Sequence, residues 1–335
     1  MNSSYEIGSE FTRVPLTDKK NNIFPACARH YVSGRSALKA IISELDSCRS
    51  VALPSWCCDS MIKPFADAGI RVEFYPVYSD GGLKQEIRTD TDAVLVMDYF
   101  GYSSGTLLPE YGGTVIRDVT HSLFSCRYDD ADYYFGSLRK WCAVPAGGFA
   151  CANDGHPLSA AQEDISAYIN LRAQAMRLKE QYLSGDSSAD KGYLALFNEA
   201  EEMLDGFGAV SSDGYDTVSY ENIDADYIGR ARRENAEILR SAFKDWLLFP
   251  DMKETDCPLF VPVLVPGGKR DALRAFLINR SVYCPVHWPV SKYHTLGEKE
   301  RFIYDNELSL VCDQRYTPRD MQYIVNTIKL FSEEP

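Results

Sequence analysis

The chain has 335 residues, enough for two domains, and its 45% hydrophobic and 25% charged residues are typical of a globular protein. Its formal net charge of −13 disfavours non-specific binding to nucleic acid and to anionic membranes, because both need an excess of Lys and Arg. No apolar run approaches the length of a membrane span, and residues 1–6 lack the features of a secretion signal. We therefore expect a cytoplasmic protein without nucleic-acid or membrane partners.

The ten cysteines are scattered along the chain, with no Cys-x-x-Cys spacing and no pair of histidines at ligand spacing. The sequence therefore predicts no metal site. In a long cytoplasmic chain we expect reduced thiols, several of them buried as small apolar side chains.

Between Ser33 and Ala152 short apolar runs alternate with segments of helix length. Helices are predicted over residues 33–45 and 58–68. Strands are predicted over residues 50–54, 71–78, 93–98, 114–119 and 133–135. Because apolar strands joined by crossovers form sheets that are covered on both faces, we predict a mainly parallel sheet with ligands at the carboxyl ends of its strands.

After Asp154 the pattern changes to longer helices, followed by a second group of strands. The predicted helices cover residues 159–183, 191–204 and 224–246, with a last one after Thr317-Pro318. The predicted strands cover residues 259–265 and 282–286. This pattern favours a large domain over residues 1–235, whose first 30 residues form an extension, and a smaller C-terminal α+β domain over residues 236–335.

The stretch that contains Asp118 and Lys140 carries the clearest chemical signal. Asp118 ends an apolar strand, His121 follows it by three residues, and Ser137 opens a Ser-x-x-Lys turn that Lys140 closes. A pyridoxal phosphate enzyme needs this arrangement, because a lysine bonds the cofactor covalently, an aspartate keeps its ring nitrogen protonated and a serine reaches its phosphate. The alternatives are a solvated surface lysine, a loop acid or helix N-cap, and a structural histidine.

A second candidate element is the run Ser33-Gly34-Arg35-Ser36 at the start of a predicted helix. Its free amides and the positive end of the helix dipole can hold an anion, and the guanidinium can bind a phosphate with two hydrogen bonds. An ordinary helix cap by Ser33 is the simpler interpretation, and the sequence alone favours it. Trp56, just past a strand end, either stacks on a cofactor ring or packs in the core.

With these motifs in this order, the chain resembles the fold type I pyridoxal phosphate enzymes, and more narrowly the DegT/DnrJ family of sugar aminotransferases. The resemblance rests on residues 33–38, 54–60, 99–101, 118–122, 137–140 and 147–148. It implies an α/β fold with an aspartate-aminotransferase-like large domain, a mainly parallel sheet and a smaller C-terminal α+β domain. It also implies a homodimer.

The resemblance further implies a role for each motif residue. Lys140 would carry the cofactor and serve as acid and base, Asp118 would face the ring nitrogen, and His121 would lie near the ring oxygen. The cofactor phosphate would be held by Ser137, Gly34, Arg35 and Ser36.

This chain departs from the family pattern at four positions. Ser137 lies three residues before Lys140, whereas many members place this serine further back. Arg35 stands where the family usually has a small or hydroxyl residue, and Asp98 stands where many members have histidine. The position that stacks on the cofactor ring falls on Trp56 or near Cys58. These departures affect what the resemblance implies about the substrate more than what it implies about the cofactor.

The function that the resemblance implies is a pyridoxal phosphate-dependent aminotransferase that moves an amino group from glutamate to a keto group on a nucleotide-linked sugar. Lys140 argues against the related dehydratases, in which histidine replaces this lysine. Two alternatives remain open. One is a non-catalytic protein that keeps the fold for binding or regulation, an alternative suggested only by the altered positions Arg35 and Asp98. The other is a different pyridoxal phosphate reaction, such as that of a lyase.

Overall fold

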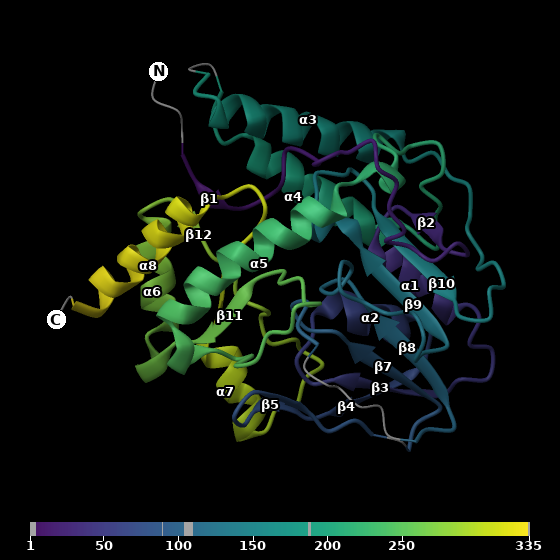
Figure 1. Ribbon diagram of the computed structural model, residues 1–335. Coiled ribbons are helices and arrows are strands. Elements are labelled where there is room, and N and C mark those ends of the chain that lie inside the picture. The colour runs from purple at the N-terminus through teal and green to yellow at the C-terminus, as the bar shows by residue number, and fades with distance from the viewer. Residues whose placement is uncertain (1–4, 89, 104–109, 187–188, 334–335) are drawn as a thin grey trace.

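Seven strands form the main sheet in the order β2-β10-β9-β8-β7-β3-β4 in the computed structural model, which describes residues 5–88, 90–103, 110–186 and 189–333 (Figure 1). The strands are β2 (Arg29–Tyr31), β3 (Ser50–Pro54), β4 (Arg71–Tyr75), β7 (Ala93–Met97), β8 (Thr114–Asp118), β9 (Tyr133–Ser137) and β10 (Gly148–Ala152). The strands from β9 to β4 run parallel, and β10 is antiparallel to both of its neighbours. The predicted mainly parallel sheet is confirmed.

Four of the sequence-predicted strands have bounds close to those observed. The predicted strand 71–78 is instead divided between β4 and a strand of a separate sheet, and the predicted strand 282–286 ends at Tyr283. β3 has the predicted bounds, β7 and β8 end one residue earlier than predicted, and β9 extends two residues further, to Ser137. β10 was not predicted, because its sequence Gly-Phe-Ala-Cys-Ala contains small residues that carry little strand preference. A short hairpin, β5 (Val77–Ser79) with β6 (Leu83–Gln85), extends beyond β4.

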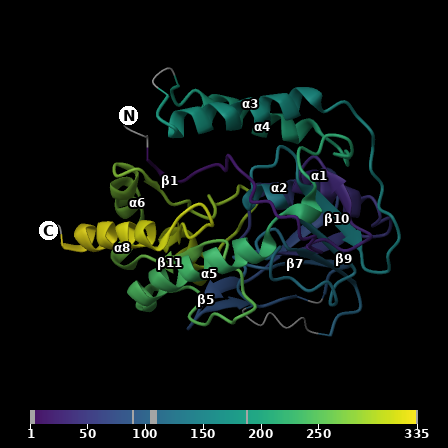
Figure 2. The same ribbon diagram turned by 45° about the horizontal axis from the view of Figure 1, so that its top comes forward.

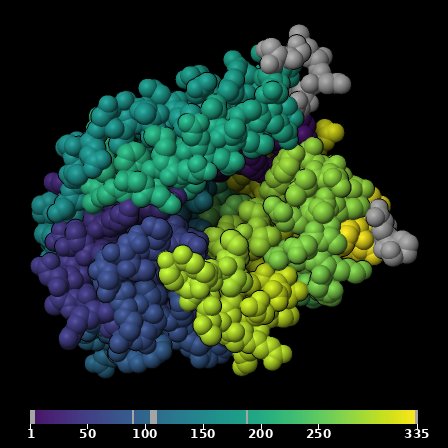
Figure 3. Space-filling model, turned by 180° about the vertical axis from the view of Figure 1, so that it is seen from behind, coloured from purple at the N-terminus to yellow at the C-terminus, as the bar shows by residue number. Residues whose placement is uncertain are grey.

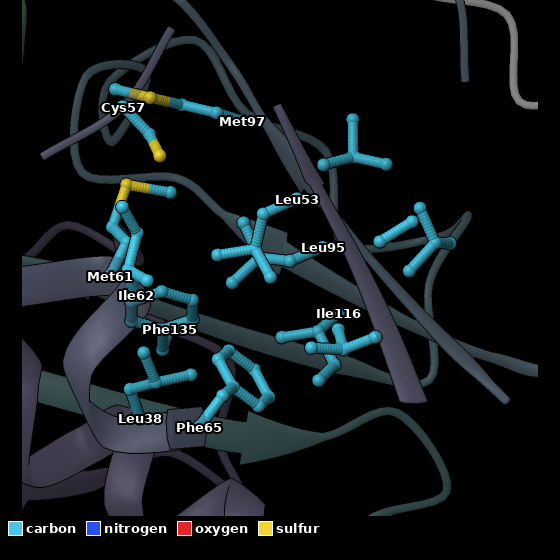
Figure 4. Close-up of a cluster of buried hydrophobic side chains, with 14 of the residues drawn as sticks. Leu38, Leu53, Cys57, Met61, Ile62, Phe65, Leu95, Met97, Ile116 and Phe135 are labelled. Atoms are coloured by element: carbon cyan, nitrogen blue, oxygen red, sulfur yellow. The ribbon is translucent and has the colours of Figure 1, made fainter. Parts of the chain in front are cut away.

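The helices α1 (Gly34–Ile42) and α2 (Asp59–Asp67) cover one face of the sheet. Figure 4 shows Leu38 of α1 and Phe65 of α2 directed at Leu95 and Ile116, which lie on the two central strands. Every residue of β3 and β7 is buried, as expected for parallel strands that are covered on both faces. This packing holds the start of α1 above the carboxyl edge of the sheet.

Two helices form a hairpin along one side of the molecule, α3 (Ser166–Leu183) and α4 (Tyr193–Met203), as Figures 1 and 2 both show. α3 begins later than the predicted residue 159, and the residues before it are not helical. Tyr182 and Tyr193 pack against each other near the turn of the hairpin, with ring centroids 5.8 Å apart. The hairpin brings α4 next to the start of α1.

The C-terminal part is built on two small sheets. β11 (Val261–Leu264) pairs with β13 (Glu307–Leu310), and β12 (Val282–Tyr283) pairs with the N-terminal strand β1 (Ile7–Gly8). The helices of this part are α6 (Arg270–Ile278), α7 (Glu298–Asn306) and α8 (Pro318–Glu333). The N-terminal segment, which the sequence assigned to the large domain, therefore contributes a strand to the C-terminal part.

Helix α5 (Ala225–Ala242) links the two parts of the molecule. Ile228, near its start, packs into the core on the second face of the main sheet, whereas Ala236 and Leu239 pack into the C-terminal core. The helix runs unbroken through residue 235, so the domain division at this residue stays a prediction.

None of the helices in the described part of the chain combines the length and the apolar character that crossing a membrane requires.

The close approach of β10 to the start of α1 gives a first prediction. A Cβ atom on Gly148 would lie 2.1 Å from the carbonyl oxygen of Ser33, a distance at which the backbone must shift. We expect Gly148→Ala to lower the free energy of unfolding by about 1–3 kcal/mol or more, measured by denaturant titration. Gly112→Ala is the matched control, because a Cβ there meets no atom within 4 Å. Equal stability of the two variants would contradict this packing.

Candidate active site

The carboxyl ends of β8 and β9 meet at one edge of the sheet, next to the start of α1. Asp118, the last residue of β8, pairs with Phe135 of β9, and the turn η1 (Leu138–Lys140) follows β9 directly. A cavity of about 130 Å³ lies at this edge. Figure 3 shows the surface hollowed where the N-terminal, central and C-terminal parts of the chain meet. Six of the eight predicted site residues line the cavity: Gly34, Arg35, Asp118, His121, Ser137 and Lys140.

Asp118 is a buried carboxylate that forms no ion pair within the described part of the chain. The residue is only 5% exposed, and its Oδ1 atom accepts a hydrogen bond of 2.8 Å from the amide of Thr120. Burial raises the pKa of Asp118 to about 6, and the Thr120 hydrogen bond opposes this rise only in part. The neighbouring Arg117 pairs instead with Asp98 and Asp130. A cationic N–H group placed next to Asp118 would therefore stabilise its charged form.

His121 lines the same cavity as a buried ring with a free nitrogen. Its ring stacks on Trp288, with centroids 5.7 Å apart and planes inclined by 23°. Within the described residues, its Nδ1 atom has no hydrogen-bond partner. Burial, and then the nearby His287 and Lys140, lowers the pKa of His121 well below its usual range, so the ring is neutral at pH 7. A neutral imidazole with a free nitrogen can hydrogen-bond to a ligand in the cavity.

Lys140 extends from a turn that its neighbours hold in place. Leu138 donates its amide to the carbonyl oxygen of Gly147 at 2.8 Å, and Trp141 donates its indole N–H to the carbonyl oxygen of Thr120 at 2.7 Å. Leu138 and Trp141 are both buried, whereas Lys140 is exposed at the cavity. Among the residues that the structure describes, Lys140 Nζ has neither a hydrogen bond nor an ion pair, so its amine is free to react.

The start of α1 matches both interpretations of its sequence. The Ser33 hydroxyl caps the helix by accepting the amide of Ser36 at 3.2 Å, as in an ordinary N-cap. The first-turn amides of Gly34 and Arg35 have no acceptor within the helix, and no other described residue accepts from them, so they could bind an anion. A Cβ on Gly34 would lie 3.5 Å from Cβ of Ser137, so the serine of the Ser-x-x-Lys turn adjoins this helix start.

The structure does not bring Ser36 to the cavity. Its side chain is fully buried beneath the helix and its hydroxyl lies 3.4 Å from the hydroxyl of Ser33.

Trp56 does not line the cavity either, although its ring contacts that of Trp288, which does. Its indole is fully buried, stacks on Tyr99 with centroids 5.0 Å apart, and donates its N–H to the carbonyl oxygen of His287 at 2.6 Å. Of the two interpretations of Trp56, the structure favours core packing. Cys58, the alternative stacking position, lines the cavity together with Trp288.

Arg35 and Arg139 share a carboxylate that the sequence did not point to. Glu201 of α4 pairs with Arg35 and also accepts a hydrogen bond from Nη2 of Arg139 at 2.7 Å. Asp205, in the short turn η2 (Leu204–Gly206) that follows α4, pairs with Arg35 as well. Burial alone would raise the pKa of Glu201, but the positive charges of Arg139 and Arg35 lower it to about 2. Arg35 therefore already has two anionic partners, and its predicted contact with a phosphate stays a prediction.

Asp98 has a structural role at its position. Its carboxylate accepts hydrogen bonds from Nη1 of Arg117 at 2.5 Å and from the hydroxyl of Ser122 at 2.8 Å. These contacts join β7, β8 and the turn after β8 beneath the cavity. Asp98, which departs from the family pattern, thus forms an ion pair with Arg117 and does not line the cavity.

No model of a protein family and no curated protein matches the sequence. Solved structures match its fold. PseC from Helicobacter pylori, an aminotransferase involved in the biosynthesis of pseudoaminic acid, has a TM-score of 0.61 at 17% identity, covering 97% of this chain and 100% of PseC. The chain has an aminotransferase fold. The sequence-predicted aspartate-aminotransferase-like architecture is therefore confirmed.

Two further structures agree with this fold. The sugar aminotransferase CalS13 from Micromonospora echinospora has a TM-score of 0.58 at 15% identity, covering 91% of this chain and 87% of CalS13. Spr1654 from Streptococcus pneumoniae, in its PLP form, has a TM-score of 0.60 at 13% identity, covering 96% of this chain and 93% of Spr1654. At these identities the likeness concerns the fold, and the chemistry has to be argued from the cavity.

The raised pKa of Asp118 predicts how stability depends on pH in protein without a cofactor. The unfolded chain releases this proton near pH 3.8, and the folded protein releases it near pH 6. The folded state therefore gains stability from this group below pH 3.8 and loses it as the pH rises through about 6.

Asp118→Asn removes this loss. We expect the variant to be more stable than the original protein at pH 7, by on the order of 1–3 kcal/mol, and the difference to vanish near pH 4. Denaturant titrations at both pH values measure it, with the exposed Asp251→Asn as control. A variant that is less stable at pH 7 would contradict the unpaired state of Asp118.

Proposed function

We propose that this protein is a pyridoxal phosphate-dependent aminotransferase that moves an amino group from glutamate to a keto group on a nucleotide-linked sugar. The observation that carries the proposal is that Lys140 and Asp118 line the same cavity. Among the described residues, the lysine amine has no hydrogen bond or ion pair and the buried carboxylate has no cationic partner. A homodimer in the cytoplasm belongs to the same proposal and rests on the family resemblance and on the sequence.

The residues present fit this cofactor at three points. Asp118 forms no ion pair with any described residue, and a protonated pyridine nitrogen could supply the cation. Nδ1 of His121, which has no partner among the described residues, could bond to the ring oxygen. The free amides of Gly34 and Arg35, next to Ser137, suit a phosphate group. The titles of two Spr1654 structures name a PLP form and a PMP form of that protein, which supports the same cofactor here.

Each residue has a defined task in the proposed reaction. Lys140 would hold the cofactor through Nζ, and once released it would take a proton from the reacting carbon of the substrate and return it. Asp118, charged when a cation lies beside it, would keep the ring nitrogen protonated. Pyridoxal phosphate, when bound, supplies an electron sink for negative charge at that carbon. Trp288 stacked on His121 would shield the site from water.

The presence of Glu201 favours one competing function, a non-catalytic protein that keeps this fold. Glu201 and Asp205 already neutralise Arg35 next to the proposed phosphate position, which would weaken cofactor binding. A lyase is the other competitor, and it would form product without consuming an amino donor.

Borohydride reduction tests the proposal. We expect the protein to turn yellow with pyridoxal phosphate, and reduction to fix the cofactor on a single peptide that contains Lys140, identified by mass spectrometry. Lys140→Ala should abolish the adduct, whereas Lys84→Ala, at an exposed position on β6, should retain it. A colourless protein without an adduct would favour the non-catalytic alternative.

The ion pairs of Glu201 give a separate prediction for cofactor affinity. Because its carboxylate competes with a phosphate for Arg35 and Arg139, we expect Glu201→Gln to lower the dissociation constant for pyridoxal phosphate roughly tenfold, measured by absorbance titration. Glu202→Gln, exposed on the same helix, is the matched control. Weaker binding by the Glu201 variant would mean that this carboxylate orients the arginines instead of competing for them.

A further inference from the structure

His287 borders a second cavity, of about 310 Å³, which Lys140 also lines. The histidine lies in the segment after β12, and its side chain is 13% exposed. We propose that Nε2 of His287 acts as a base in this cavity and that Glu307 and Ser309 are positioning residues that hold its ring in the required form. Only the role of His287 in the reaction rests on the proposed function, whereas the form of its ring rests on the geometry.

Glu307 is a buried acid on β13 whose carboxylate hydrogen-bonds to His287 and Ser309. Glu307 and Ser309 are both fully buried, and because they lie two positions apart, their side chains leave the strand on the same face. Leu308 and Leu310, on the other face, pack into the C-terminal core. One oxygen of Glu307 accepts the backbone amide of His287 at 2.8 Å, and the other accepts the hydroxyl of Ser309 at 2.5 Å. Within the described part of the chain, the only ion-pair contact of this carboxylate is with Nδ1 of His287, at 3.9 Å.

Ser309 determines which nitrogen of His287 carries the proton. Its hydroxyl has one hydrogen atom and donates it to the carboxylate of Glu307, so towards His287 it can only accept. Nδ1 of His287 lies 2.8 Å from this hydroxyl and is therefore the donor. In the neutral imidazole the hydrogen atom then sits on Nδ1, and Nε2 is left with a free lone pair. The buried carboxylate thus holds Nε2 in the form that accepts a proton.

Nε2 of His287 is accessible from the cavity. It makes no hydrogen bond within the described part of the chain and stays open to the cavity that His287 lines. The rings of Phe100 and Phe260 pack against the imidazole, with centroids 5.1 and 5.3 Å away, and help to fix its orientation. The basic nitrogen is therefore held in the same cavity as the amine of Lys140.

The neighbouring histidine, His121, is not suited to this role. The two imidazole rings lie close together, with centroids 5.6 Å apart. Burial, and then the nearby His287 and Lys140, lowers the pKa of His121 well below its usual range, so His121 does not accept a proton near neutral pH. At His287 the carboxylate of Glu307, 3.9 Å from Nδ1, would stabilise the positive charge that forms when Nε2 accepts a proton.

The proposed step is a single proton transfer. An amino donor enters the cavity as an ammonium ion, and its nitrogen can attack the carbon atom bonded to Lys140 Nζ only after it has lost a proton. One N–H bond of the ammonium group breaks and an Nε2–H bond forms, which leaves a neutral amine and an imidazolium. The imidazolium then passes the proton to water at the cavity.

Nitrogen NMR of the histidine side chains tests the form of the ring in protein without cofactor. We expect the Nδ1–H form for His287, assigned by the loss of its signals in His287→Gln. Ser309→Ala should shift the ring towards the Nε2–H form, and Ser309→Thr, which keeps the hydroxyl, should restore the Nδ1–H form. Thr327→Val, which removes a buried hydroxyl from α8, is the matched control and should change nothing. An Nε2–H form in the original protein would overturn the inference, whether or not the variants fold.

The half-reaction with glutamate tests the base. Stopped-flow absorbance follows how fast glutamate bleaches the yellow protein. We expect His287→Ala to lower the limiting rate constant roughly 10²–10⁴-fold, with little change in the glutamate concentration that gives half the limiting rate. Added imidazole should restore part of the rate. Ser309→Ala should lower the rate constant by a smaller factor, and Thr327→Val should leave it unchanged.

An unchanged rate constant in His287→Ala would overturn the role as a base, and so would a loss that imidazole does not restore. Failure of the proposed function is seen separately. The protein would then stay colourless with pyridoxal phosphate, while the NMR signals still report the form of the His287 ring.

Discussion

The structure depends on the meeting of two parallel strand ends with one helix start. β8 ends at Asp118 and β9 ends at Ser137, and their parallel pairing delivers both ends to the same edge of the sheet. β10 then returns antiparallel, and Gly148 lets it approach the backbone of Ser33 at the start of α1. The lysine turn, the buried acid and the free helix amides come together because of this arrangement of backbone, before any side chain is considered.

The electrostatics of the cavity differ from one end to the other. Asp118 is buried and forms no ion pair with a described residue, and burial raises its pKa to about 6. At Arg35 the opposite holds, because Glu201 and Asp205 already satisfy the guanidinium. A ligand with a cationic ring and an anionic group would be stabilised by the charge of Asp118. Its anionic group would have to compete with Glu201 and Asp205 for Arg35. The affinity for such a ligand is therefore set at the α1–α4 contact.

The sequence predicted the elements whose signal is local. Asp118 and Lys140 could be placed in one site because the ends of parallel strands share an edge, and the apolar runs of those strands are clear. The core position of Trp56 could not be predicted, because a tryptophan after a strand end can turn either way. Glu201 was missed for a different reason: it reaches the cavity through the α3–α4 hairpin, whose packing no short motif encodes.

The central claim is that one ligand bridges Lys140 and Asp118. A crystal structure of the protein grown with pyridoxal phosphate tests it most directly. The account predicts electron density continuous from Lys140 Nζ into the cofactor, with the ring nitrogen about 3 Å from a carboxylate oxygen of Asp118 and the phosphate at the first turn of α1. Cofactor bound elsewhere, or a ring nitrogen facing away from Asp118, would contradict it.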